Sequence, residues 1–134
     1  MFRKLLFLYI AAVSFSGCNE KKAMPDSDID TARTFIKNIQ DNNFEAAESF
    51  ILADQENKAS LSKLKKDAQA KSTAALEKYK NADIIIDELT PVNDSVTIVN
   101  YAISSNKEQK NKLKLIKRNG KWLVDLKYTF SGNL

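Results

Sequence analysis

A change of hydropathy period near Asp83 most constrains the fold of this 134-residue chain. Between residues 28 and 80, apolar side chains recur every three or four positions, which is typical of amphipathic helices. From Asp83 to Thr129 apolar and polar residues alternate, which is typical of half-buried strands. Helices followed by a run of strands predict an α+β fold, and this length suits one domain.

Three helices are predicted before the sheet, over residues 28–41, 44–52 and 55–80. Ser27 or Asp28 can cap the first helix, and Asn43 can cap the second, because their side-chain oxygens accept a backbone N–H of the first turn. The third stretch contains several residues of low helix propensity, so a break is expected near residues 71–74.

Four antiparallel strands are predicted, over residues 83–89, 96–104, 111–118 and 121–129. Asn119-Gly120 separates the last two and is a strong signal for a two-residue hairpin turn. The turn sets these pairs: Arg118–Lys121, Lys117–Trp122, Ile116–Leu123, Leu115–Val124, Lys114–Asp125, Leu113–Leu126 and Lys112–Lys127. Apolar residues thereby meet apolar residues, and Lys114 meets Asp125. The pair of Lys112 and Lys127 brings two like charges together.

The second strand has two registers against the third. The preferred register buries more apolar area, and it places three residues on the inner face with Leu113 and Leu115: Val99, Tyr101 and Ile103. The alternative register turns the residues between them inward: Val96, Ile98, Asn100 and Ala102. The preferred register leaves an apolar stripe on the outer face, a candidate homodimer contact formed by Ile98, Ile116 and Leu123.

The N-terminal segment has the pattern of a secretory signal peptide over residues 1–17. Arg3 and Lys4 are followed by an uncharged stretch from Leu5 to Gly17, which is shorter than the roughly 20 residues that a membrane span needs. Phe15-Ser16-Gly17-Cys18 resembles the lipobox of bacterial lipoproteins. The resemblance implies diacylglyceryl modification of Cys18 and cleavage before it, and two acyl chains anchor a protein stably. The alternative is a plain signal peptide with an incidental Cys.

Cleavage changes the charge balance of the chain. Without Arg3 and Lys4, 19 basic residues face 17 acidic ones, a net charge of +2. This balance argues against a nucleic-acid partner, which needs a concentrated basic face. Residues 18–27 are interpreted as a lipidated tether and residues 28–134 as the domain. We therefore expect an exported protein anchored to a membrane of the bacterial cell envelope, with the membrane and the leaflet left open.

Three phrases carry a family resemblance: Asp30-Thr31-Ala32-Arg33-Thr34-Phe35-Ile36, Asn43-Phe44-Glu45-Ala46-Ala47 and Gly120-Lys121-Trp122-Leu123-Val124. With the element order, they resemble the cystatin-like, nuclear-transport-factor-2-like superfamily, and within it a lumazine-binding-like domain family of unknown function. The resemblance covers about residues 28–130. It implies three helices packed on a curved four-stranded antiparallel sheet, which forms a cone with a cavity. It supplies no catalytic residues.

The composition excludes several kinds of catalytic site and metal site. The chain has no His and one Cys, which excludes Ser-His-Asp and Cys-His catalysis, imidazole zinc sites and thiolate metal clusters. No cofactor or metal is therefore expected, and no catalytic residue is assigned. Lysines 110, 112 and 114 are interpreted as a solvated face, with contact to anionic headgroups or a polyanion as the alternative.

The residues that could line a pocket inside the cone are Tyr79, Tyr101, Trp122 and Tyr128, with Asn100 or Asp87 as polar members. The expected function is a non-enzymatic module that binds a small ligand or an envelope protein. The alternative is a small enzyme of the steroid-isomerase or dehydratase type, in which a buried carboxylate beside a tyrosine acts as a base.

Overall fold

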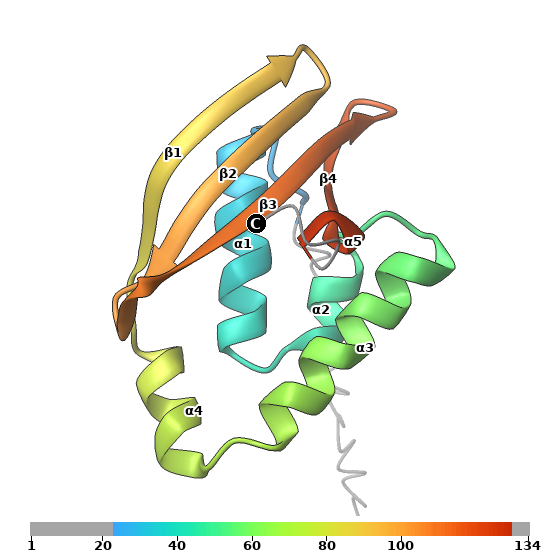
Figure 1. The fold of residues 1–134 in the computed structure, drawn as a ribbon. Coiled ribbons are helices and arrows are strands. Elements are labelled where there is room, and N and C mark those ends of the chain that lie inside the picture. Colours follow the sequence, from blue (N-terminus) through green and yellow to red (C-terminus); the bar gives the residue numbers. More distant parts are fainter. Residues whose placement is uncertain (1–22, 130–134) are drawn as a thin grey trace, which may run out of the picture.

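The computed structural model describes residues 23–129 (Figure 1). The predictions for the signal segment and for Cys18 lie outside these residues. The described part is an α+β fold with five helices and a four-stranded antiparallel sheet, which confirms the predicted class. The elements are α1 Asp28–Gln40, α2 Phe44–Glu48, α3 Gln55–Gln69, α4 Thr73–Lys80, β1 Ile84–Asn93, β2 Val96–Ile103, β3 Asn106–Arg118, β4 Lys121–Asp125 and α5 Leu126–Thr129.

The predicted helix starts are confirmed by their caps. The Ser27 side chain accepts a hydrogen bond from the N–H of Asp30 at 3.1 Å and caps α1. The Asn43 side chain accepts from the N–H of Ala46 at 3.2 Å and caps α2. In each case the side chain satisfies a backbone donor that the first helical turn leaves without a partner.

The second helix is shorter than predicted, because it ends at Glu48 and not at residue 52. The chain beyond it pairs with the edge of β4 instead. The N–H of Val124 donates to the carbonyl of Phe50 at 2.7 Å, and the N–H of Leu52 donates to the carbonyl of Val124 at 3.0 Å. These bonds cover the backbone groups of an otherwise open sheet edge.

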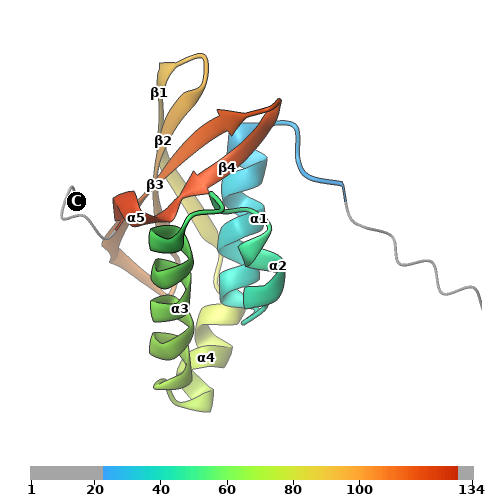
Figure 2. The same ribbon diagram turned by 90° about the vertical axis from the view of Figure 1, so that its right-hand side faces the viewer.

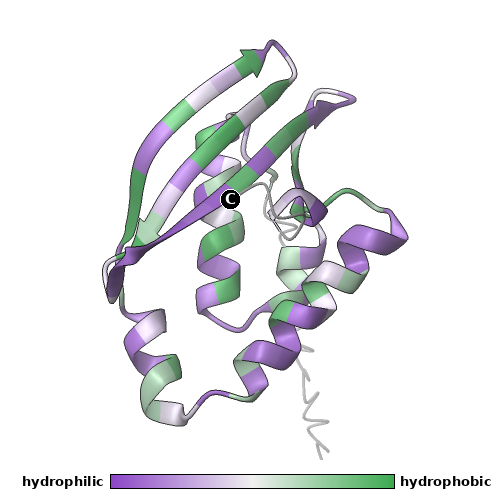
Figure 3. Ribbon diagram, viewed as in Figure 1, coloured by the Kyte–Doolittle hydropathy of each residue, from purple (hydrophilic) through white to green (hydrophobic). Residues whose placement is uncertain are grey.

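The predicted third helix is two helices, and the break lies where it was expected. α3 ends at Gln69, and Ser72 caps α4 by accepting from the N–H of Ala75 at 3.2 Å. Within residues 23–129, four helices therefore precede the sheet in place of the predicted three. Figure 3 shows that α3 and α4 are mostly hydrophilic, with isolated apolar residues.

The sheet has the strand order β1-β2-β3-β4. The β3–β4 register is as predicted from Arg118–Lys121 to Lys114–Asp125. Asn119 and Gly120 have φ values of 50° and 75°, as a two-residue hairpin turn of the primed type requires. β2 adopts the preferred register, since Val99 lies opposite Leu113. β1 extends beyond its predicted end, and its Pro91 is tolerated because β1 is an edge strand.

The last strand was predicted to run to residue 129, but β4 ends at Asp125 and α5 follows. The fully buried Asn57 of α3 causes this change. Its Oδ1 accepts hydrogen bonds from the backbone N–H groups of Leu126 and Lys127. In an extended β4 the Lys127 N–H would instead point toward Lys112 of β3. The predicted Lys112–Lys127 and Leu113–Leu126 pairs are therefore absent from the β3–β4 ladder, and that part of the register prediction was wrong.

Asn57 belongs to a polar cluster at the start of α3. Its amide donates to Asp54 Oδ2 at 2.8 Å and to Asp125 Oδ1 at 3.5 Å. The pKa of Asp54 lies below its usual value, first because the Asn57 N–H donates to it, and further because of the Asn57 amide and the nearby Lys127. Lys127 donates to Asp54 at 3.3 Å. The cluster ties α3 to the end of β4.

The hydrophobic core lies between α1 and the inner face of the sheet (Figures 1 and 2). Its fully buried members include Ala32 and Ile36 of α1 with Val99, Leu115 and Val124 of the strands. All described core and flanking residues lie between Met24 and Leu126, so a form of the protein that begins at Asn19 retains the packed domain. No helix within residues 23–129 is long and apolar enough to cross a membrane.

Candidate functional site

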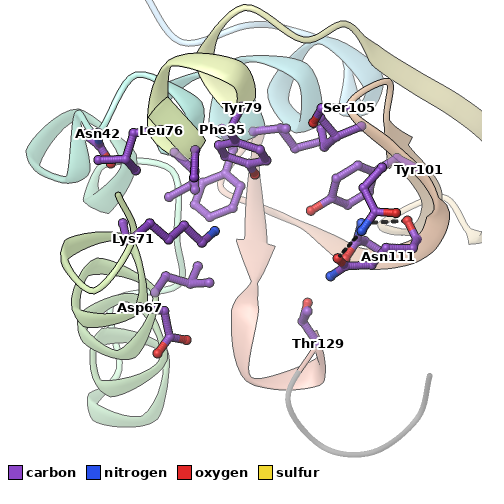
Figure 4. A pocket seen from close by; sticks show the side chains of 18 of the residues that line it. Phe35, Asn42, Asp67, Lys71, Leu76, Tyr79, Tyr101, Ser105, Asn111 and Thr129 are labelled. Atoms are coloured by element: carbon purple, nitrogen blue, oxygen red, sulfur yellow. Dashed lines mark hydrogen bonds between the residues drawn. The ribbon is translucent and has the colours of Figure 1, made fainter. Parts of the chain in front are cut away.

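A cavity of about 540 Å³ lies at the end of the domain where α1 finishes and α3 and α4 meet. Its walls are formed by α1, α3, α4 and α5 and by the facing parts of β2 and β3 (Figure 4). This volume falls within the range of small-molecule sites. The helices contribute one side, and the inner face of the sheet contributes the other.

The deep part of the cavity is apolar. Phe35 of α1, Leu113 of β3 and Leu126 of α5 line it and are almost completely buried. Most of the other apolar wall residues are aliphatic: Ile36, Ile39, Leu64, Leu76 and Ile103. An apolar wall that is not filled by protein can bind the apolar part of a ligand, because such surface is favourably removed from water.

Two tyrosines place hydroxyl groups in this wall. Tyr101 lies on the inner face of β2, opposite Asn111 of β3. Figure 4 shows its hydroxyl pointing into the cavity. Burial raises the pKa of Tyr101 far above its usual value, and the neighbouring Tyr79 raises it further. Burial also raises the pKa of Tyr79. Both side chains are therefore neutral at physiological pH, and each hydroxyl can donate a hydrogen bond.

Gln40 holds Tyr79 and α4 in place. This buried side chain of α1 donates to the carbonyls of Tyr79 at 2.9 Å and of Ala82 at 3.0 Å. Lys37 supports the same end of α4 by donating to the carbonyl of Lys80 at 3.1 Å. α4 has no buried residue of its own, so these bonds are important for fixing this wall of the cavity.

The charged groups lie on the helical side of the cavity. Lys71, in the connection between α3 and α4, places its ammonium 5.1 Å from the centre of the Tyr79 ring, within the range of a cation–π contact. Lys78 also lines the cavity, and Asp67 is the acidic residue among the lining residues described. The wall is therefore slightly positive.

The predicted pocket residues fall in two places. Tyr79 and Tyr101 line the cavity, whereas Trp122 and Tyr128 are not among its lining residues. Trp122 packs in the core with the Lys117 ammonium 5.7 Å from its ring centre, and the Lys114 ammonium lies 5.5 Å from the ring centre of Tyr128.

The predicted polar members also lie elsewhere. Asp87 forms an ion pair with Lys110 at 3.1 Å on the exposed part of β1. Asn100 donates to Glu88 at 3.1 Å. Neither Asp87 nor Asn100 is among the residues that line the cavity.

The outer-face stripe forms as the register predicts. Ile116 lies opposite Leu123 across the β3–β4 ladder, and Ile98 lies one strand away opposite Lys114. All three side chains are partly exposed. This face and the cavity lie on opposite sides of the sheet.

The enzyme alternative needs a carboxylate within hydrogen-bond reach of a cavity tyrosine. Asp67 is exposed and comes from α3, whereas Tyr101 comes from β2, and Figure 4 shows the two on opposite walls. Within residues 23–129, no hydrogen bond joins Tyr101 to a carboxylate. The described residues therefore do not form the carboxylate–tyrosine pair that this alternative names.

Lys71 was missed from the sequence as a cavity residue. It lies in the short connection between two helices that were predicted as one, so its direction could not be derived from a helical period. Ser72 was the available signal, because serine is a preferred N-cap and so marks the start of a new helix directly after Lys71.

Comparison with known proteins found no matching family model, no matching curated protein and no matching solved structure.

Proposed function

We propose that this chain is a lipid-anchored protein of a bacterial cell envelope whose domain binds a small, largely apolar ligand without chemical conversion. The cavity between the helices and the sheet is the observation that carries this proposal. A ligand-binding role fits it better than a protein-docking role, because the apolar surface lies in a concavity of small-molecule size. The lipobox-like Phe15-Ser16-Gly17-Cys18 supports the anchoring part.

The proposed fold is the cone of the cystatin-like, nuclear-transport-factor-2-like superfamily. It is supported by the order of helices before an antiparallel meander and by the packing of α1 on the inner face of the sheet. The site in such a cone lies between helix and sheet, which agrees with the position of the cavity. The proposal draws no catalytic residue from the superfamily.

The position of the tether supports access to the cavity from the aqueous side. α1 begins near the β1–β2 turn, where Asp28 accepts a hydrogen bond from Thr97 at 2.7 Å. The cavity lies at the other end of α1, roughly 20 Å away for 13 helical residues. Figure 2 shows these two ends of the domain on opposite sides. An anchor that joins the domain before Ser27 is therefore attached at the end of α1 opposite the cavity.

Filling the cavity should weaken binding strongly. Ala68 of α3 lines the cavity, whereas Ala59 is exposed on the same helix and does not line it. In a form beginning at Asn19, we expect the neutral fluorescent probe N-phenyl-1-naphthylamine to bind, and its affinity to fall about tenfold or more in Ala68→Trp. A tenfold loss of affinity corresponds to roughly 1.4 kcal/mol of binding free energy. The cause is the loss of contacts between the probe and the wall that the Trp side chain covers.

Ala59→Trp is the matched control, because it adds the same side chain outside the cavity. Fluorescence titration should give this variant the affinity of the parent protein. No binding to the parent protein, or an equal loss in both variants, would count against a ligand site in the cavity.

A further inference from the structure

The polar groups of the cavity are arranged asymmetrically. The almost completely buried Phe35, Leu113 and Leu126 make one part of the cavity apolar. Lys71, in the helical connection, and Tyr101, on β2, place an ammonium and a hydroxyl on facing walls. Figure 4 shows both groups pointing into the space between the walls. A ligand that satisfies both regions has an apolar body and one polar end.

The ammonium of Lys71 is available to such a polar end. Within residues 23–129 Lys71 forms no ion pair, whereas several other lysines do, among them Lys37, Lys110 and Lys127. Its ammonium is exposed and lies 5.1 Å from the centre of the Tyr79 ring, and no oxygen among the described residues accepts from it. Lys78 adds a second positive charge to the lining, against one carboxylate from Asp67. The cavity therefore favours an anion over a cation.

The Tyr101 hydroxyl supplies a second donor. The amides near it are already engaged: Asn111 donates to the carbonyl of Gln109 at 3.3 Å, and Asn106 donates to the Gln109 side chain at 3.2 Å. Within the described residues the Tyr101 hydroxyl has no hydrogen-bond partner. Because burial raises the pKa of Tyr101, the group stays protonated and donates to an oxygen acceptor.

We propose that the ligand is an alkyl carboxylate, with its carboxylate between the Lys71 ammonium and the Tyr101 hydroxyl and its chain against Phe35, Leu113 and Leu126. This inference rests on the proposed ligand-binding function. The carboxylate accepts one hydrogen bond from the ammonium and one from the hydroxyl, and both are charge-assisted because the acceptor is ionised. A flexible alkyl chain fits because the wall is mainly aliphatic.

Displacement of N-phenyl-1-naphthylamine by three ten-carbon probes tests the ligand class in a form beginning at Asn19. Decanoate should displace the probe at a concentration about tenfold lower than 1-decanol does, and decyltrimethylammonium should be the weakest. If the three compete equally, the charge preference is wrong although the cavity binds. If the fluorescent probe itself does not bind, both the ligand class and the proposed function fail.

Removing the ammonium of Lys71 tests whether this group causes the preference for a carboxylate. Lys71→Met should weaken decanoate about tenfold and leave 1-decanol within twofold, because it keeps most of the length of the side chain and removes its charge. Lys66→Met on α3 changes the net charge equally, but Lys66 does not line the cavity, so it should affect neither ligand.

Tyr101→Phe should weaken decanoate about threefold, since it removes one neutral donor. A loss for decanoate in Lys66→Met equal to that in Lys71→Met would overturn the assignment of the carboxylate to Lys71, because the effect would then come from net charge alone.

Discussion

Asn57→Ala should lower the free energy of unfolding by about 3 kcal/mol. Asn57 is fully buried, and its amide joins four groups: the N–H groups of Leu126 and Lys127 and the carboxylates of Asp54 and Asp125. Alanine leaves the buried N–H of Leu126 without an acceptor. A buried backbone donor without a partner costs more than the net value of the bond that it made.

Urea denaturation of the form beginning at Asn19 measures this change. Asn81→Ala is the control, because Asn81 is the exposed C-cap of α4 and makes no side-chain hydrogen bond within the described residues. We expect this control to lie within about 0.5 kcal/mol of the parent protein. A loss of less than 1 kcal/mol in Asn57→Ala would mean that the Asn57 bonds do not hold β4 and α5 against α3.

Cys18→Ala should abolish lipid attachment completely. The proposed anchor is a diacylglyceryl group on the Cys18 thiol, and no other Cys is present in the chain to accept it. Each buried methylene contributes about 0.8 kcal/mol to membrane retention, so removing two acyl chains releases the protein from stable anchoring. Incorporation of an alkyne-labelled fatty acid in the expressing bacterium measures the attachment, and membrane fractionation measures the release.

Ser16→Ala provides the control for this experiment. It keeps a small residue two positions before Cys18, as the lipobox pattern requires, so labelling should persist. Continued fatty-acid labelling of Cys18→Ala would refute the anchor. The proposal for the cavity would be unaffected by that result, since the lining residues within the described part of the chain lie between Phe35 and Thr129.

The sequence predicts the β3–β4 hairpin because every signal there is local. Asn119-Gly120 specifies the turn. The alternation of apolar and polar residues then predicts the correct strand pairs from Arg118–Lys121 to Lys114–Asp125. The end of β4 could not be predicted in this way, because the group that ends it is Asn57, 68 residues away from Asp125 in the chain. The end of α2 was missed for the same reason, since Phe50 and Leu52 bond to Val124 across the fold.

Residues of the candidate site were predicted only where they belong to the repeating apolar pattern of a strand or a helix. Tyr101 alternates with Val99 and Ile103, so its inward direction follows from the register. Tyr79 belongs to the thin apolar stripe of the third predicted helix. Lys71 lies outside any period, and its place in the cavity depends on the angle between α3 and α4, which is fixed by tertiary contacts such as those of Gln40.

The central claim is that a ligand binds between the helices and the inner face of the sheet. The most direct test is an NMR titration of isoleucine δ-methyl groups with N-phenyl-1-naphthylamine, in the form beginning at Asn19. Ring currents of a bound probe should shift Ile36, Ile39 and Ile103, which line the cavity, and leave Ile98 and Ile116 of the outer face unchanged. Shifts confined to Ile98 and Ile116 would contradict the account.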